Sequence, residues 1–526
     1  MKRIMIKTSA VVMTALMIMS MLAGCGGKSE TEKNGEKVLN FGAQLYSDGT
    51  VDPTYDINGA WNVVRFGVGE TLFRFSDSME VEPWLAEKYE TEDNKTWVIT
   101  LKEGIKFSDG CDMTASKVAA SMQNMLDKGP DGAATPEKYV PYETKITADD
   151  EANTLTLELP DENCNLPGNL AYPVCVIVDV DHTDDWTNGV IGTGPYKISD
   201  FREQVGYTVV RNDNYYADVP YDTVNIKFMG DASAKAMALR SGEVDVTENI
   251  TNVADIQEFQ DDPAFTVDIA QSVRCGFVWM NMSRKPLDNK ELRKAIVMAI
   301  DHDAICNSKT IGGLYTPGFS VLPSTLSFGY DKLTESYPYD PEEAEKVLDE
   351  AGIRDTDGDG WRELDGEMID LKFVSYENRL LNDLSDAYAI ALKNIGIKVT
   401  ADYGSSDDQW TKLTTLEYDL NNNSWNTVGN GDPTDYMANW YSKSEADYCG
   451  YQNEEYDALY EELLKKADKE KRADILQKMQ QILIDDAACI IDGYYNSSMI
   501  CSEKVVGAHI STADFYWITA DIKPAE

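Results

Sequence analysis

The chain has 526 residues, of which 43% are hydrophobic, and this is enough apolar material for two or more buried cores. Its formal net charge is −44, so it repels nucleic acid and anionic lipid headgroups, and we expect no nucleic-acid partner. The acidic residues are spread along the chain, which indicates a well-solvated surface and says little about a ligand.

Residues 1–24 have the layout of a secretory signal peptide. A basic start with Lys2, Arg3 and Lys7 precedes a mainly apolar stretch over residues 8–22. This stretch is shorter than the ~20 residues of a membrane-spanning helix. We therefore expect export rather than insertion.

The segment Leu22-Ala23-Gly24-Cys25 resembles a bacterial lipobox. The resemblance implies cleavage before Cys25, whose thiol then carries diacylglycerol and whose amine can carry an acyl chain such as palmitate. We expect an extracytoplasmic lipoprotein, in the periplasmic space or at the outer cell surface, held to the cell membrane of a bacterium by Cys25. An ordinary secretory signal with a chance cysteine is the alternative.

Residues 25–37 are polar and lack apolar periodicity, which predicts a flexible linker before a body that begins at residue 38. Strand patterns follow over residues 96–101, 154–159 and 224–228. Helical periodicity predicts helices over residues 115–126, 232–241, 289–300, 341–351, 381–395 and 453–484, the last interrupted near Asp468. Mixed strands and helices without an internal repeat predict an α/β architecture with more than one lobe.

The chain has nine cysteines, and none of them forms a CxxC pair. Export permits disulfides, and Cys164 and Cys175 are the closest pair in sequence after the leader. Free buried thiols fit the sequence equally well, so the pairing stays open.

Several segments, in order, resemble the extracytoplasmic solute-binding proteins, family 5, of peptide, dipeptide and nickel ABC importers. Each motif alone is weak, but their shared order along nearly the whole mature chain is specific. The segments that carry the resemblance are 84–87 (WLAE), 97–110 (WVITLKEGIKFSDG), 113–118 (MTASKV), 192–198 (GTGPYKI), 210–212, 215–216, 238–246 (ALRSGEVDV), 292–301 (LRKAIVMAID), 344–352 and 395–399 (IGIKV).

The resemblance implies a fold of the periplasmic-binding-protein type II, with two lobes around a ligand cleft. Lobe I would have its core in residues 38–62, 190–273 and 493–526, with an extra domain in residues 63–189. Lobe II would comprise residues 274–492. Closure of the lobes about the crossing segments would trap the ligand.

Arg379 is the first candidate ligand-binding residue. It lies between a predicted strand end and the predicted helix from Leu381, where a guanidinium beside the positive end of a helix suits a carboxylate. In dipeptide-binding relatives, an arginine at the matching place anchors the peptide carboxylate. A surface ion pair between Arg379 and Asp383 is the alternative.

The second candidate segment is 424–433 (SWNTVGNGDP), a Gly/Asn-rich loop with Trp425, Asn426 and Asp432. It resembles the tryptophan-to-Asp-Pro loop of the family, in which an aspartate holds the α-ammonium of a dipeptide. Here Gly429 takes that place, so a simple dipeptide ligand is in doubt, and Asp432 is either a substitute or a turn residue. Aromatic walls are predicted at Tyr46, Trp425, Tyr436 and Trp440, with burial in a core as the alternative.

Asp355, Asp357, Asp359 and Glu363 resemble part of a calcium loop, with oxygens at alternate positions and glycine at the turn. The twelfth position of that pattern requires Glu, and this chain has Gly366 there. We expect either a structural calcium ion or an acidic turn before the strand near Ile369. No other cofactor is expected.

The leading functional hypothesis is a binding protein rather than an enzyme. A monomeric lipoprotein would capture extracellular di- or oligopeptides and deliver them to the transmembrane subunits of an ABC permease. Nickel or a nickel chelate is the alternative ligand, weakened by only three histidines. A secreted carbohydrate-active lipoprotein enzyme is a remote alternative, and a peptide-pheromone sensor fits the sequence as well as a nutrient importer does.

Overall fold

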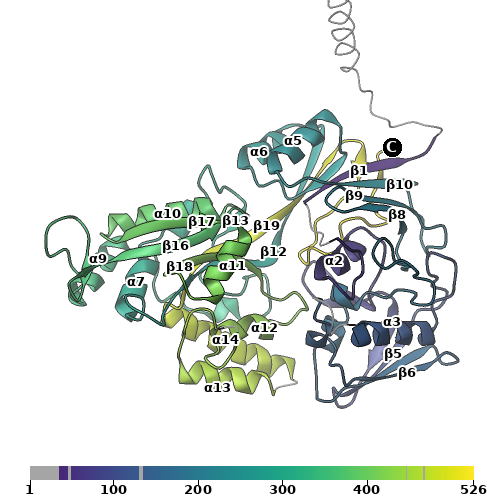
Figure 1. Cartoon of the computed structure of the whole chain (residues 1–526), viewed down its shortest axis with the longest axis horizontal. Coiled ribbons are helices and arrows are strands. Elements are labelled where there is room, and N and C mark those ends of the chain that lie inside the picture. Colours follow the sequence, from purple (N-terminus) through teal and green to yellow (C-terminus); the bar gives the residue numbers. More distant parts are fainter. Residues whose placement is uncertain (1–34, 45–48, 129–133, 446, 466–467) are drawn as a thin grey trace, which may run out of the picture.

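The computed structural model describes residues 35–44, 49–128, 134–445, 447–465 and 468–526. Two lobes lie side by side and are joined by a pair of long strands, β12 (Phe265–Met280) and β19 (Cys489–Ser502) (Figure 1). These strands pair antiparallel, with a register shift between Gln271 and Cys275. The irregular ladder lies where the chain passes from one lobe to the other, which makes this the place where the lobes can hinge.

One mixed sheet runs through both lobes in the order β17-β16-β18-β12-β19-β11-β1-β10-β9-β8. The short strand β13 (Tyr315–Thr316) pairs with β19 beside this path. The remaining strands of the sheet are β1 (Val38–Ala43), β8 (Tyr196–Arg202), β9 (Gly206–Arg211), β10 (Thr223–Phe228), β11 (Val246–Glu248), β16 (Asp370–Tyr376), β17 (Lys398–Gly404) and β18 (Leu420–Asn426).

The extra domain of lobe I is built on a separate antiparallel sheet in the order β4-β5-β7-β6. The alternating residues of β5 place Trp97, Ile99 and Leu101 in the core, and α3 packs over β6 and β7. Its elements are β2 (Phe73–Phe75), β3 (Val81–Pro83), β4 (Ala86–Glu90), β5 (Thr96–Leu101), α3 (Ala115–Lys128), η2 (Pro136–Lys138), β6 (Lys145–Asp149), β7 (Thr154–Glu158), α4 (Leu166–Asn169) and η3 (Pro173–Cys175).

Helices α2, α5 and α6 belong to lobe I (Figure 1). The other long helices outside the extra domain belong to lobe II and cover both faces of its sheet. In lobe II, one buried cluster lies under α7, α9 and α10, and a second, rich in aromatic side chains, lies under α13 and α14. The helices are α2 (Ile57–Arg65), α5 (Ala232–Ser241), α6 (Val253–Asp261), α7 (Lys290–Met298), α8 (His302–Cys306), η4 (Tyr330–Lys332), α9 (Pro341–Glu350), α10 (Leu381–Asn394), α11 (Ser406–Thr414), α12 (Thr434–Met437), η5 (Ala438–Trp440), α13 (Glu454–Leu463) and α14 (Lys469–Asp485).

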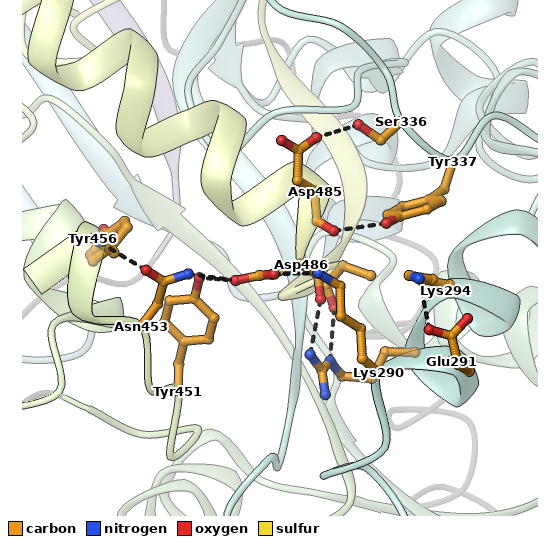
Figure 2. Close-up of polar contacts among 12 residues, drawn as sticks. Lys290, Glu291, Lys294, Ser336, Tyr337, Tyr451, Asn453, Tyr456, Asp485 and Asp486 are labelled. Carbon is orange, nitrogen blue, oxygen red and sulfur yellow. Dashed lines mark hydrogen bonds and ion pairs between the residues drawn. The ribbon is translucent and has the colours of Figure 1, made fainter.

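Asp486 holds the end of α14 to the neighbouring segments (Figure 2). Its carboxylate accepts hydrogen bonds from Lys290 Nζ at 2.6 Å, Tyr451 Oη at 2.6 Å and Asn453 Nδ2 at 2.8 Å. Burial alone would raise the pKa of Asp486, but these hydrogen bonds lower it below its ordinary value. The contacts fix α14 against α7 and against the segment that leads into α13.

The predicted strands and helices are confirmed, including the interruption near Asp468, which caps α14 by accepting from the Lys471 amide at 3.0 Å. Every cysteine from Cys111 to Cys501 is a free thiol. Within the described part of the chain, none of the helices combines the length and apolar character needed to cross a bilayer. Cys25 lies outside the described residues, so its lipidation stays a prediction.

Candidate functional site

The topology of lobe II locates a ligand site before any side chain is considered. Strand β16 pairs parallel with β17 on one side and with β18 on the other. The chain leaves β16 through α10 to β17 and then crosses back through α11 to β18, so the order reverses at β16. In open α/β sheets, ligands bind outside the carboxyl ends of strands at such a reversal. The candidate site therefore lies at residues 377–380 and 426–433.

Lobe I has a matching reversal. Strand β1 pairs parallel with β10 and with β11, and α5 connects the latter two. The carboxyl ends of β1 and β11 are at Ala43 and Glu248. Glu248 lies opposite Met499 on the crossing strand β19. In lobe II, Asn426 ends β18 opposite Arg274 on the crossing strand β12. Both reversals therefore lie beside the hinge strands, and we call the region between them the interlobe groove, although Ala43 and Glu248 are themselves fully buried.

Arg379 lies at the carboxyl end of β16, beside the hinge. Its guanidinium carbon is 5.5 Å from the ring centroid of Tyr495 on β19, and its carbonyl oxygen accepts from Tyr315 Oη at 2.9 Å. Arg379 and Leu380 both have left-handed backbone angles, with φ of 44° and 58°. Such strain in non-glycine residues is typical of functional segments. This position suits a residue that anchors a ligand carboxylate, and that role of Arg379 stays a prediction.

Trp425 and Asn426 form the carboxyl end of β18. The Trp425 indole donates to Asn423 Oδ1 at 3.2 Å and is half-buried among aromatic rings. Its ring centroid is 6.3 Å from that of Trp410 on α11, a side chain that is 46% exposed. Trp410 was not among the predicted aromatic walls, because the sequence of α11 does not indicate which of its side chains stay exposed. The pair presents an open aromatic surface on lobe II.

Asp432 has one partner on α14 and others in its own loop. Arg472 on α14 binds its Oδ2 at 2.5 Å, and the Thr434 amide donates to its Oδ1 at 2.8 Å. Both side chains of the ion pair are largely buried, so the contact fixes the loop to α14. This geometry favours the turn role that the sequence left open. Binding of a ligand ammonium group by Asp432 stays a prediction.

The loop after β18 reaches across to the extra domain. Asn430 donates from Nδ2 to Asn169 Oδ1 at 3.0 Å, and its carbonyl oxygen accepts from Asn165 Nδ2 at 2.9 Å. Gly168 lies so close to the Asn430 carbonyl oxygen that a side chain there would collide with it. The lobes are therefore in direct contact at this loop.

A cavity of about 280 Å³ borders the loop on the side of α14. Lobe I contributes Met79, Val81 and Cys164 to its lining, and lobe II contributes Phe328 and Arg472. A cavity therefore remains between the lobes on the α14 side of the loop, although the loop itself contacts both lobes. Its mixed polar and apolar lining suits a solute that is neither wholly charged nor wholly apolar.

An aromatic cluster of lobe I, not predicted from the sequence, packs directly against this loop, and its Tyr172 is only 6% exposed. Tyr172 faces Gly429, with a ring carbon 3.1 Å from where a side chain at Gly429 would begin. Tyr139 stacks on Tyr172 with ring centroids 4.3 Å apart, and Trp61 donates to Tyr172 Oη at 3.2 Å. Gly429, where the family resemblance implies an aspartate, instead packs closely against this aromatic ring.

Two of the predicted aromatic walls lie in a core instead. Tyr436 is 5% exposed and Trp440 is fully buried. Their rings pack against Phe277 on the inner face of β12, at centroid distances of 5.9 Å each. Burial against this strand lets both side chains support the loop rather than contact a solute. Tyr46 lies outside the described residues.

The predicted calcium loop brings its oxygens together. One carboxylate oxygen from each of Asp355, Asp357, Asp359 and Glu363 lies within 4.8 Å of the others. Gly358 donates its amide to Asp355 Oδ1 at 2.7 Å, and the turn leads into a hairpin of β14 (Glu363–Leu364) and β15 (Glu367–Met368). The arrangement agrees with both alternatives, an ion site and an acidic turn.

Comparison with known proteins decides the family. Residues 80–448 match the bacterial extracellular solute-binding proteins, family 5, middle region. The chain belongs to this family. The resemblance drawn from the motifs is therefore confirmed, and with it a fold of the periplasmic-binding-protein type II. Members of family 5 are binding proteins rather than enzymes.

This family 5 protein is similar to both peptide-binding and nickel-binding relatives. It is 25% identical to the dipeptide-binding protein DppE of Bacillus subtilis, over 92% of this chain and 91% of the relative. It is 24% identical to the nickel-binding protein NikA of Staphylococcus aureus, over 97% of this chain and 98% of the relative. The crystal structure of NikA from Brucella suis in complex with Fe(III)-EDTA has a TM-score of 0.82 and 19% identity, covering 93% of this chain and all of the other. This structural likeness shows the fold.

Proposed function

We propose that this protein is the substrate-binding lipoprotein of an ABC importer, which captures extracellular peptides in the interlobe groove and delivers them to the membrane permease. The observation that carries the proposal is the pair of strand-order reversals that face each other across the hinge strands β12 and β19. Arg379 and the loop of residues 426–433 lie at one of these reversals, which gives a peptide a charged anchor and main-chain partners.

The lining of the groove supports a peptide over a bare metal ion. Trp425 and Trp410 offer partly exposed aromatic surface, and Asn426 offers a partly exposed amide group. Aromatic walls bind varied side chains, while amides and carbonyls bind the main chain that every peptide shares.

Nickel, as a chelate, is the second candidate ligand, because a relative of similar identity is named a nickel-binding protein. The three histidines of the chain do not meet at the groove loop. His182 contacts Asp109 in the extra domain, His302 is buried in lobe II, and His509 contacts Asp268. Direct ligation of nickel by histidine is therefore disfavoured, whereas a nickel chelate needs few protein ligands.

Native mass spectrometry of the purified mature protein tests the proposal. We expect a spread of copurified peptide masses that disappears after unfolding and refolding. A single nickel-containing adduct would favour the second candidate, and a protein that releases neither would contradict both.

The lipid anchor is tested separately. We infer that Cys25 holds the protein at the outer face of the cell membrane, where a monomer meets the permease. A Cys25→Ala variant should appear in the culture medium or in the soluble periplasmic fraction instead of the membrane fraction, with its ligand binding unchanged. A variant that stays with the membrane would contradict the anchor.

A further inference from the structure

Four potential metal ligands gather on the extra domain, away from the interlobe groove. They are Asp109, Cys111, Asp179 and His182, and one donor atom from each lies within 4.8 Å of the others. Asp109 and Cys111 belong to the turn between β5 and α3, whereas Asp179 and His182 follow η3. The fold therefore brings two distant segments together to form the cluster.

The three distances from His182 Nδ1 to the other donor atoms approach those of a tetrahedral site, and the remaining ones are within 4.8 Å. His182 Nδ1 lies 3.5 Å from Cys111 Sγ, 3.0 Å from Asp179 Oδ2 and 2.7 Å from Asp109 Oδ2. Tetrahedral Zn²⁺ with bonds of about 2.0–2.3 Å separates its donor atoms by about 3.3–3.7 Å. The Cys111–His182 distance already fits, and the two carboxylate oxygens must move outward by only about 0.3–0.7 Å.

The backbone holds the donors in place before any ion binds. Asp179 is buried, and its Oδ1 accepts from the Asp181 amide at 3.1 Å. The Asp179 carbonyl oxygen accepts from Thr183 Oγ1 at 2.7 Å, and the Cys111 amide donates to Asp109 Oδ1 at 2.9 Å. By contrast, the His182 side chain is 47% exposed, so the cluster is anchored on one side and open to solvent on the other.

The charges balance around a divalent ion. Two carboxylates and a thiolate carry three negative charges, which a divalent cation reduces to one. Lys117 Nζ lies 2.5 Å from Asp179 Oδ2 and compensates that remaining charge. Binding releases the thiol proton of Cys111 and any proton on His182 Nδ1, because both atoms must be deprotonated to act as ligands.

We propose that Asp109, Cys111, Asp179 and His182 bind a divalent transition-metal ion of the zinc class. One thiolate, one imidazole and two carboxylates form a donor set that suits Zn²⁺ and Co²⁺ better than the hard cations Ca²⁺ and Mg²⁺. The site ties the β5–α3 turn to the segment after η3 and acts as a structural clamp in the extra domain. It does not depend on the ligand of the groove.

Titration of the metal-free protein with Zn²⁺ and with Co²⁺ tests the proposal. We expect one high-affinity ion per chain by calorimetry, and a thiolate-to-cobalt charge-transfer band when Co²⁺ binds. Cys111→Ser should abolish the band, and both Cys111→Ser and His182→Gln should weaken Zn²⁺ binding by about 100-fold or more.

Matched controls separate this site from other thiols and from the groove. Cys164→Ser changes the other half-buried thiol of the extra domain, and His509→Gln changes another exposed histidine. Both should bind Zn²⁺ as the unaltered protein does, and so should Arg379→Ala. Absence of stoichiometric binding, or binding that survives both Cys111→Ser and His182→Gln, would overturn the proposal and leave an ion-pair cluster around His182.

Discussion

Asn430 of lobe II and Asn169 of the extra domain are joined by a hydrogen bond of 3.0 Å from Nδ2 to Oδ1. Asn165 adds a second bond by donating to the Asn430 carbonyl oxygen at 2.9 Å. Both contacts bridge residues that are more than 260 positions apart in sequence and belong to different lobes. Because they exist only when the lobes are together, they stabilise the closed arrangement relative to the open one.

Asn430→Ala should shift the ligand-free protein toward the open form. The substitution removes one interlobe hydrogen bond, worth about 1 kcal/mol, so the closed-to-open ratio should fall about fivefold. Small-angle scattering should show a larger radius of gyration without ligand and a smaller difference once ligand is bound. Asn188→Ala, which removes only local contacts with Asp185, is the control. An unchanged radius for Asn430→Ala would show that this contact does not govern closure.

Arg379 should distinguish peptides by their carboxyl terminus. If its guanidinium binds a terminal carboxylate, Arg379→Ala should weaken binding of a free peptide by about 10- to 100-fold, as expected for a charged hydrogen bond. The same peptide with an amidated terminus should bind the variant and the unaltered protein equally. Calorimetry with both peptides measures the difference.

The control for this experiment is Arg354→Ala, which alters an exposed arginine of lobe II that donates to the Asp349 carbonyl oxygen. It should leave both affinities unchanged. Equal losses for free and amidated peptides in Arg379→Ala would assign Arg379 to the support of the hinge through Tyr495 and Tyr315 rather than to the ligand.

Local patterns were sufficient for the strands and helices named from the sequence, but other strands, β12 and β19 among them, were not predicted from their local patterns. The helix break near Asp468 could be predicted because a capping aspartate precedes an apolar period, and this signal lies within a few residues. The two lobes and the location of the groove could be predicted only from the shared order of several motifs, since no single segment specifies how distant strands pair.

The walls of the groove could not be predicted from local patterns. Trp425 begins the Gly/Asn-rich loop and Trp440 follows it, yet Trp440 is fully buried against β12 whereas Trp425 is half-exposed. Tyr172 was not predicted, because nothing in the sequence around it indicates that a loop of lobe II packs closely against its buried ring. Which aromatic residue becomes a wall depends on where the second lobe comes to lie.

Asp492 should make the stability of the protein fall as the pH rises. This side chain is fully buried on β19 beside Gly493, and burial raises its pKa to about 8, although Tyr388 and Asn422 oppose the shift. In the unfolded chain, an aspartate has a pKa of about 3.9, so between these values the folded state holds a proton that the unfolded state has lost. The contribution is complete below the unfolded pKa and is lost as the pH approaches 8.

Asp492→Asn mimics the protonated carboxyl group and should remove this pH dependence. The free energy of unfolding is measured with urea at about pH 6 and about pH 9. Between these pH values, the variant should gain stability relative to the unaltered protein. The gain should be up to about 1.4 kcal/mol for each pH unit below the folded pKa of about 8. Asp261→Asn, at the exposed end of α6, is the control. A variant with the same pH dependence as the unaltered protein would show that another group is responsible.

Calcium should stabilise lobe II if the acidic turn is an ion site. The four gathered carboxylates repel one another without a cation, and a bound Ca²⁺ would offset that repulsion and raise the melting temperature. The rise should grow with Ca²⁺ concentration, vanish with a chelator and be absent in Asp357→Asn. Asp357 suits this test because, in the described part of the chain, its carboxylate accepts from the local Asp359 amide alone, at 3.0 Å. Asp355, by contrast, shapes the turn through Gly358 and Gly360. If Ca²⁺ raises the melting temperature of Asp357→Asn as much as that of the unaltered protein, or changes neither, the segment is an acidic turn whose carboxylates accept backbone amides and bind no ion.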